Sequence, residues 1–115
     1  MVISATGARG ASTGSGPTTA RLRERCRETV TARQDDVIAL SHSLHAEPEL
    51  ACEEHRSAKK IADLVEGAGF RVERGVCGLP TAFSATAGSG GLVIGICAEY
   101  DALPGIGTSY RRSIP

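Results

Sequence analysis

The stretch that decides the fold reads Leu92-Val93-Ile94-Gly95-Ile96-Cys97-Ala98 and is followed at once by Glu99-Tyr100-Asp101. The apolar run is as long as one β-strand and far shorter than the ~20 residues that cross a bilayer. A continuous apolar run of this length is typical of a central strand that is covered on both faces. The sequence therefore predicts an α/β fold in which helices flank a sheet and acidic residues follow a buried strand.

Two weaker segments before this run predict further strands. In the segment 70–73, Phe and Val alternate with Arg and Glu, which is the period of a half-buried strand. Gly75, Gly78 and Pro80 interrupt that pattern before a second strand over Thr81–Ala87. The run Gly88-Ser89-Gly90-Gly91 then predicts a turn into the apolar strand.

Two helices are predicted ahead of the strands. Thr18 or Thr19 can cap a helix that begins at Ala20 and ends before Pro48. Its apolar stripe slips out of period around Arg33 and consists of Leu22, Cys26, Val30, Val37, Leu40 and Leu44.

A second helix is expected to start near Cys52, with Glu53 and Glu54 in its first turn, where carboxylates suit the positive end of the helix dipole. Gly67 and Gly69 supply its end. The residues expected on its buried side are Ala58, Ile61, Ala62, Leu64, Val65 and Ala68.

The first 17 residues are expected to be a disordered tail. Met1–Pro17 contains four glycines among small polar residues, so it offers too little apolar area to offset the entropy of ordering. Three strands and two helices also make only an incomplete piece of a sheet that needs both faces covered.

Composition excludes several classes of function. Lys plus Arg number 13 and Asp plus Glu number 13, so no overall charge draws the chain to nucleic acid or to a membrane. The four cysteines, Cys26, Cys52, Cys77 and Cys97, lack metal-type spacing and fit reduced thiols. No secretory signal precedes the folded part, so a cytoplasmic location is expected.

The acids Glu99 and Asp101 are the concentrated chemical signal. Open α/β sheets bind ligands at the carboxyl ends of their strands, where carboxylates can ligate a metal, orient a ligand or transfer protons. The plain alternative is that acids follow strands because strands end at water. The histidines are His42, His45 and His55. His42 and His45 lie three apart on one helix face but have no third ligand nearby, and zinc usually needs three or four, which favours exposed or structural histidines.

Two segments resemble the N-terminal signature of a family of zinc-dependent metallo-amidohydrolases, which includes aminoacylases, indole-acetyl-amino-acid hydrolases and aminobenzoyl-glutamate hydrolases. The first is Leu44-His45-Ala46-Glu47-Pro48-Glu49-Leu50, followed by Glu54 and Ser57-Ala58. The second and more specific is Ala98-Glu99-Tyr100-Asp101-Ala102-Leu103-Pro104-Gly105-Ile106-Gly107. The resemblance spans about residues 37–107, with the helix-to-strand step at Gly69-Phe70-Arg71-Val72 between the two segments.

This resemblance implies the start of a two-domain enzyme, often dimeric, whose catalytic domain binds two zinc-like ions. Metal-bound water attacks the amide bond of an N-acyl amino acid or small peptide, aided by a glutamate base. Asp101 matches the aspartate that supports the metal centre without binding the metal, whereas Glu99 is only a weak candidate ligand. Residues 18–107 would then be the N-terminal part of the catalytic domain.

The sequence departs from the family after Gly107. There the family continues with His-Ala-Cys-Gly-His, which supplies a cysteine and a histidine ligand, but here residues 108–115 read Thr-Ser-Tyr-Arg-Arg-Ser-Ile-Pro. The resemblance therefore predicts a fragment that binds no metal and is inactive alone, with 108–115 as a divergent tail. A frameshift, an early stop or an error in gene prediction would each give such a tail. Two alternatives are a short non-catalytic protein that binds a partner through exposed sheet edges, and a piece that joins a separately encoded remainder.

Overall fold

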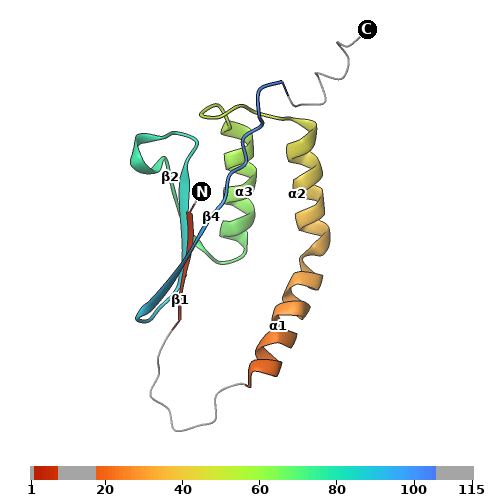
Figure 1. Ribbon diagram of the computed structural model, residues 1–115, viewed down its shortest axis with the longest axis vertical. Helices are drawn as coiled ribbons and strands as arrows, with labels where there is room; N and C mark the ends of the chain where they lie inside the picture. The colour runs from red at the N-terminus through yellow and green to blue at the C-terminus, as the bar shows by residue number, and fades with distance from the viewer. Residues whose placement is uncertain (1, 8–17, 106–115) are drawn as a thin grey trace.

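The computed structural model describes the backbone of residues 2–7 and all atoms of residues 18–105 (Figure 1). The tail expected at 108–115 lies outside these residues. In chain order the elements are β1 (Val2–Gly7), α1 (Thr19–Ala32), α2 (Gln34–Ala46), α3 (His55–Gly67), β2 (Arg71–Arg74), the 3-10 turn η1 (Val76–Gly78), β3 (Phe83–Gly88) and β4 (Leu92–Cys97).

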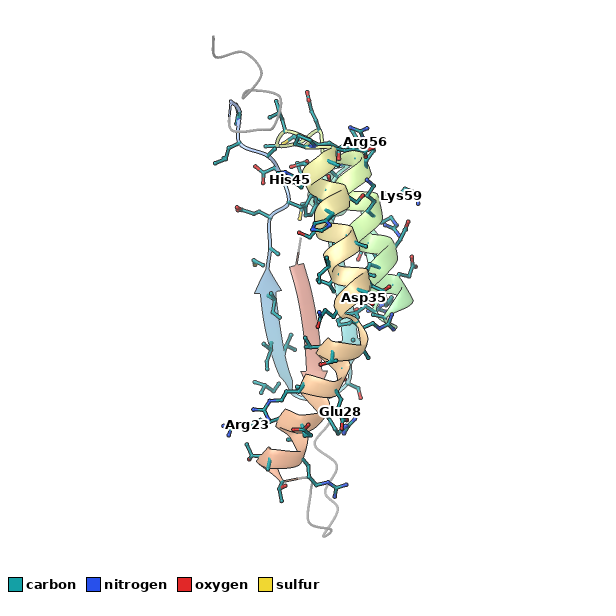
Figure 2. All side chains as sticks on the ribbon, turned by 90° about the vertical axis from the view of Figure 1, so that its right-hand side faces the viewer. Arg23, Glu28, Asp35, His45, Arg56 and Lys59 are labelled. Atoms are coloured by element: carbon teal, nitrogen blue, oxygen red, sulfur yellow. The ribbon has the colours of Figure 1, made fainter. Side chains whose placement is uncertain are left out.

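The first predicted helix is present but divided. Thr18 caps α1 as expected, because its hydroxyl oxygen accepts a hydrogen bond from the Arg21 backbone N–H at 3.4 Å. Arg33 leaves helical geometry with φ −107° and ψ 4° and separates α1 from α2. The break coincides with the slip in the apolar stripe. Of that stripe only Leu40 and Leu44 pack against the core, while the side chains of α1 stand in solvent (Figure 2).

Helix α3 provides the face that covers the sheet. It buries Ser57, Ala58, Ile61 and Ala62, while Leu64 and Val65 are half-buried and Ala68 is exposed. The helix begins at His55, so Glu53 and Glu54 precede its first turn instead of forming part of it. It ends before Gly69, whose φ of +93° lies in the left-handed region that glycine adopts without strain.

The sheet has the strand order β2-β3-β1-β4. The β2–β3 and β1–β4 pairs are antiparallel, and β1 runs parallel to β3. The expectation of disorder over Met1–Pro17 therefore differs from the structure at Val2–Gly7, which forms strand β1, while the rest of that range lies outside the described residues. Backbone hydrogen bonding to a strand on either side stabilises this short segment in a way that composition does not reveal.

Strand β4 departs most from expectation. The apolar run predicted a central strand buried on both faces, but β4 lies at an edge of the sheet and all six of its residues are exposed. The run has the composition of a buried strand, yet none of the described elements covers it.

The core is correspondingly small. Its buried members are Ile61, Ala62, Phe83 and Ala85, to which half-buried side chains of α2, α3 and β2 are added. The radius of gyration is 17.9 Å, whereas a compact 100-residue domain has about 13 Å. The architecture is thus the predicted incomplete α/β piece, a small sheet with helices on one side (Figure 1). None of the helices in the described residues is long and apolar enough to span a membrane.

Candidate functional site

The segment after β4 places the predicted acids beside the loop that precedes α3. The Ala102 backbone N–H donates to the Glu49 carbonyl oxygen at 2.7 Å, and Leu50 and Ala102 form a parallel bridge. The Tyr100 hydroxyl donates to the Thr81 carbonyl oxygen. The Tyr100 ring also stacks on Phe83 of the core, with centroids 6.2 Å apart. Two backbone contacts and one aromatic anchor therefore fix the position of Glu99–Asp101.

An open hollow of about 310 Å³ lies beside these contacts. Its wall carries Glu99, Tyr100 and Asp101 from the segment after β4, together with Cys52 and Glu54 from the loop before α3. Glu99 is exposed, Tyr100 and Asp101 are half-buried, and Glu54 is buried. Glu99 and Asp101 thus line the same hollow, and their role there stays a prediction.

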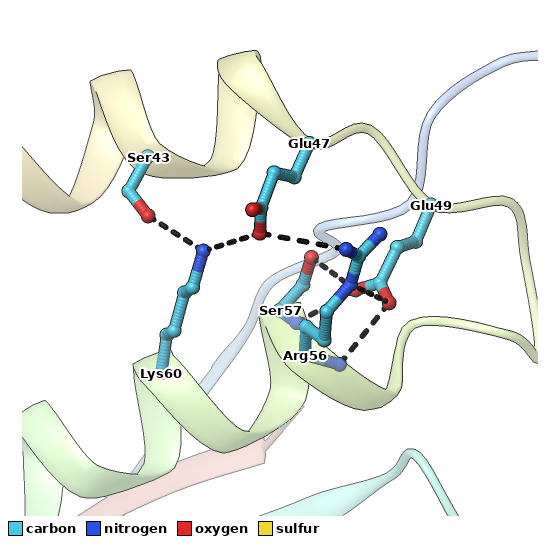
Figure 3. Close-up of polar contacts among 6 residues, drawn as sticks. All are labelled: Ser43, Glu47, Glu49, Arg56, Ser57 and Lys60. Carbon is cyan, nitrogen blue, oxygen red and sulfur yellow. Dashed lines mark hydrogen bonds and ion pairs between the residues drawn. The ribbon is translucent and has the colours of Figure 1, made fainter.

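Glu49 ties the start of α3 to this loop (Figure 3). One carboxylate oxygen accepts from the backbone N–H and the Nε of Arg56, both at 3.2 Å, and the other accepts from the backbone N–H and the hydroxyl of Ser57, both at 2.7 Å. Burial alone would raise the pKa of Glu49, but these hydrogen bonds lower it to about 2. The carboxylate therefore satisfies free N–H groups at the positive end of α3 as an internal anion.

A second ion pair joins α2 to α3 beside this contact. Lys60 donates to the Ser43 hydroxyl at 2.7 Å and to the Glu47 carboxylate at 2.9 Å (Figure 3). The hydrogen bond and charge of Lys60 lower the pKa of Glu47, and Arg56 adds to the effect. Glu47 and Glu49 belong to the first segment of the family signature, and both hold helices together.

Glu54 is the buried acid of the hollow. Its residue is 8% exposed, and its Oε2 has no hydrogen-bond partner among the described residues. Burial acts to raise its pKa, but hydrogen bonds from its own backbone, the Thr81 side chain and the Cys52 backbone lower it overall. Burial, with a contribution from the Glu54 charge, raises the pKa of Tyr100. The Tyr100 hydroxyl thus stays protonated and able to donate to the Thr81 carbonyl oxygen.

The donor set of the described residues does not fit a metal centre. Within residues 2–7 and 18–105, no three side chains of His, Cys, Asp or Glu come together in a way that could hold a metal ion. His42, His45 and His55 belong to α2 and α3, and all four cysteines are free and exposed. What the hollow offers chemically is negative charge and a tyrosine hydroxyl, which can orient a neighbouring group or move a proton.

A second hollow of about 310 Å³ shares Thr81 and Ala82 with the first, and its other lining residues include His55, Lys59 and Arg74. Its cations are already paired, since Asp63 accepts from Lys59 at 2.6 Å and from Arg74 at 2.9 Å. It holds neither Glu99 nor Asp101, so the hollow at the end of β4 is the stronger candidate.

Sequence reasoning missed the partners that position the acids. The hydrogen bond from Tyr100 to Thr81 joins residues 19 positions apart, and the one from Ser57 to Glu49 joins residues eight positions apart. Neither separation matches the period of a helix or a strand, so periodicity could not predict these contacts. The only available signal was that Glu49 and Ser57 both belong to the first signature segment.

Comparison with curated proteins finds relatives that are all hydrolases by name. The chain is 37% identical over 79 residues to a subunit of the p-aminobenzoyl-glutamate hydrolase of Escherichia coli, and the match covers 69% of this chain and 16% of that protein. It is 33% identical over 85 residues to thermostable carboxypeptidase 2 of Saccharolobus solfataricus, covering 72% of the chain and 21% of the relative. It is 35% identical over 97 residues to the Xaa-Arg dipeptidase of Mus musculus, and the match covers 75% of this chain and 22% of that protein.

The chain thus spans about a fifth of the length of the curated relatives it matches. No protein-family model matches the chain. No solved structure matches it either.

Proposed function

The chain resembles the N-terminal part of the metallo-amidohydrolases and peptidases, and from this premise we propose that it is a segment of an enzyme that hydrolyses the amide bond of N-acyl amino acids or small peptides. The observation that carries the proposal is the attachment of Glu99–Asp101 to the Glu49–Glu54 loop. The two segments of the family signature lie far apart in the chain, yet they meet there at one hollow.

In this proposal Asp101 is a positioning residue. Its half-buried carboxylate lies at the rim of the hollow and would orient groups supplied from outside the described residues. The described residues do not assemble a metal centre, so the two divalent ions of the family would be held by other residues. The 115-residue chain is accordingly proposed to be inactive alone, and its homodimeric parent and cytoplasmic location remain predictions from the sequence.

A chimera tests this proposal. The matched segment of this chain replaces the corresponding 85-residue segment of the thermostable carboxypeptidase 2. Release of the C-terminal amino acid from a small peptide is then measured for the chimera and for its Asp101→Asn variant.

The expected result is an active chimera that loses most of its kcat with Asp101→Asn, while Glu53→Gln, a change of an exposed acid in the loop before α3, leaves kcat unchanged. A folded chimera whose Asp101→Asn variant is as active as its parent would refute the proposed role of Asp101. A folded chimera without activity would refute the proposal that this segment serves an amidohydrolase.

A second candidate function follows from the exposed edge strand β4, which is suited to pairing with another chain. It requires no chemistry at Asp101, so an Asp101→Asn variant that retained every measurable property would favour it.

A further inference from the structure

The two chain neighbours of Asp101 are both fixed by contacts with earlier segments. On one side the Tyr100 hydroxyl donates to the Thr81 carbonyl oxygen. On the other side the Ala102 backbone N–H donates to the Glu49 carbonyl oxygen at 2.7 Å. Because a residue between two fixed neighbours has little freedom to reorient its backbone, these two contacts determine where the Asp101 side chain leaves the chain.

Thr81 connects one of these contacts to Glu54. Thr81 is 7% exposed, and its carbonyl oxygen accepts from Tyr100 while its side chain hydrogen-bonds the Glu54 carboxylate. The Cys52 backbone is a second donor to that carboxylate. Hydrogen-bonded chains of this kind carry energetic coupling between residues that do not touch, so a displacement of Glu54 reaches Tyr100 through Thr81.

The state of Glu54 depends on the same contact. Burial acts to raise the pKa of Glu54, but hydrogen bonds from its own backbone, the Thr81 side chain and the Cys52 backbone lower it, so the group is ionised at neutral pH. An ionised carboxylate only accepts hydrogen bonds, and it therefore requires the Thr81 hydroxyl to donate. The other carboxylate oxygen, Oε2, has no partner among the described residues, so none of their side chains competes with Thr81 for it.

We propose that Glu54 is a positioning residue for Asp101, which it holds through Thr81 and Tyr100. This role rests on the proposed function, in which Asp101 orients groups at the hollow. It also gives a physical reason for the meeting of the two signature segments, since Glu54 belongs to the first and Asp101 to the second. The stacking of the Tyr100 ring on Phe83 is a second anchor that is independent of Glu54. If that stacking were sufficient, loss of Glu54 would leave Asp101 in place, which the following experiments decide.

The first test measures whether Glu54 and Tyr100 act as a unit in the full 115-residue chain. Urea unfolding gives the unfolding equilibrium constants of the wild type, Glu54→Gln, Tyr100→Phe and the double variant. Because both substitutions interrupt one path, the fold-change of the double variant should fall short of the product of the two single fold-changes by more than about twofold. Glu53→Gln changes an exposed neighbour and should combine with Tyr100→Phe without such a deviation. A product that holds for both pairs overturns the linkage.

The second test measures the consequence for Asp101 in the carboxypeptidase chimera. Thr81→Val keeps the shape of the side chain but removes the hydroxyl that reaches Glu54, so we expect kcat to fall by more than about tenfold while KM changes little. Thr81→Ser keeps the hydroxyl but loses a buried methyl group, and it should retain most of the parent's kcat. Loss of packing alone would instead affect Thr81→Ser as well.

The outcomes separate the two proposals. A folded, active chimera whose Thr81→Val variant keeps the kcat of its parent overturns the positioning role alone. A folded chimera that is inactive without any further substitution overturns the proposed function, and this role with it. The unfolding measurements on the chain itself require no catalysis, so they decide the linkage between Glu54 and Tyr100 in either case.

Discussion

Replacement of Glu49 by glutamine is the perturbation for which the structure gives the most detailed expectation. The change keeps the size of the side chain but removes the charge that accepts four hydrogen bonds from Arg56 and Ser57. One of the two carboxylate oxygens also becomes an NH₂ group, which would face the N–H or O–H donors of Arg56 or Ser57 without being able to accept from them. We therefore expect Glu49→Gln to free the start of α3 and to loosen the loop that carries Ala102.

The magnitude follows from the pKa of Glu49, which falls from its ordinary 4.5 to about 2. A shift of one unit corresponds to about 1.4 kcal/mol, so the carboxylate contributes at most about 3 kcal/mol to folding. The Glu49 side chain is 9% exposed, but that of Arg56 is 61% exposed, so solvent screens that half of the contact. The expected loss in the free energy of unfolding at pH 7 is therefore about 1–2 kcal/mol.

The pH dependence of stability provides a second test of the effect of Glu49→Gln. Because the folded pKa is lower than the unfolded one, the stabilisation is fully present above pH 4.5 and is lost as the pH falls through about 2. Urea unfolding followed by circular dichroism, at pH 7 and at steps below pH 4.5, should show the difference between wild type and Glu49→Gln shrinking with acid. Glu53→Gln, which changes an exposed acid in the same loop, serves as the control. Equal stability of the two variants at pH 7 would refute the reasoning.

Three further predictions concern the hollow and the core. Cys52 has a φ of +67°, so Cys52→Gly should relieve strain and raise the free energy of unfolding by about 1 kcal/mol, and a lower value in urea unfolding would contradict this. Ile61→Ala should lower the free energy of unfolding by about 2–4 kcal/mol in the same assay, because Ile61 is 8% exposed. Leu103→Ala, at 62% exposure, should cost little, and equal losses in the two variants would contradict the placement of Ile61 in the core. Tyr100→Phe removes the hydrogen bond to the Thr81 carbonyl and should cost about 1 kcal/mol. Since the pKa of Tyr100 is raised, its contribution is complete below pH 10 and should fade as the pH rises through the folded value, which an alkaline series of unfolding curves measures.

The sequence predicted those elements whose periodicity reflects their own environment. The 3.6-residue pattern found the buried face of α3, with Ile61 and Ala62 at its centre, and the alternation at 70–73 found β2. The cap at Thr18 was also found, because capping depends on one side chain and a backbone N–H three residues away. These features are local, so local sequence is sufficient.

What the sequence did not predict depends on which segment lies beside which. Strand β1 is held by backbone pairing with β3 and β4, which its composition does not encode. The apolar pattern of β4 indicates a strand that is covered on both faces, but it does not identify the element that covers it. At the site, the position of Asp101 after a strand was readable, whereas the attachment of its segment through Glu49 joins residues far apart in the chain.

The measurement that tests the central claim most directly is the zinc content per mole of the 115-residue chain and of the carboxypeptidase chimera, prepared side by side and dialysed against the same buffer. If this segment carries the scaffold and Asp101 but not the metal ligands, we expect the chimera to retain as much zinc as the unmodified carboxypeptidase measured beside it, and the chain alone to retain none. Stoichiometric zinc on the chain alone, or a folded chimera that has lost the metal of its host, would contradict the account.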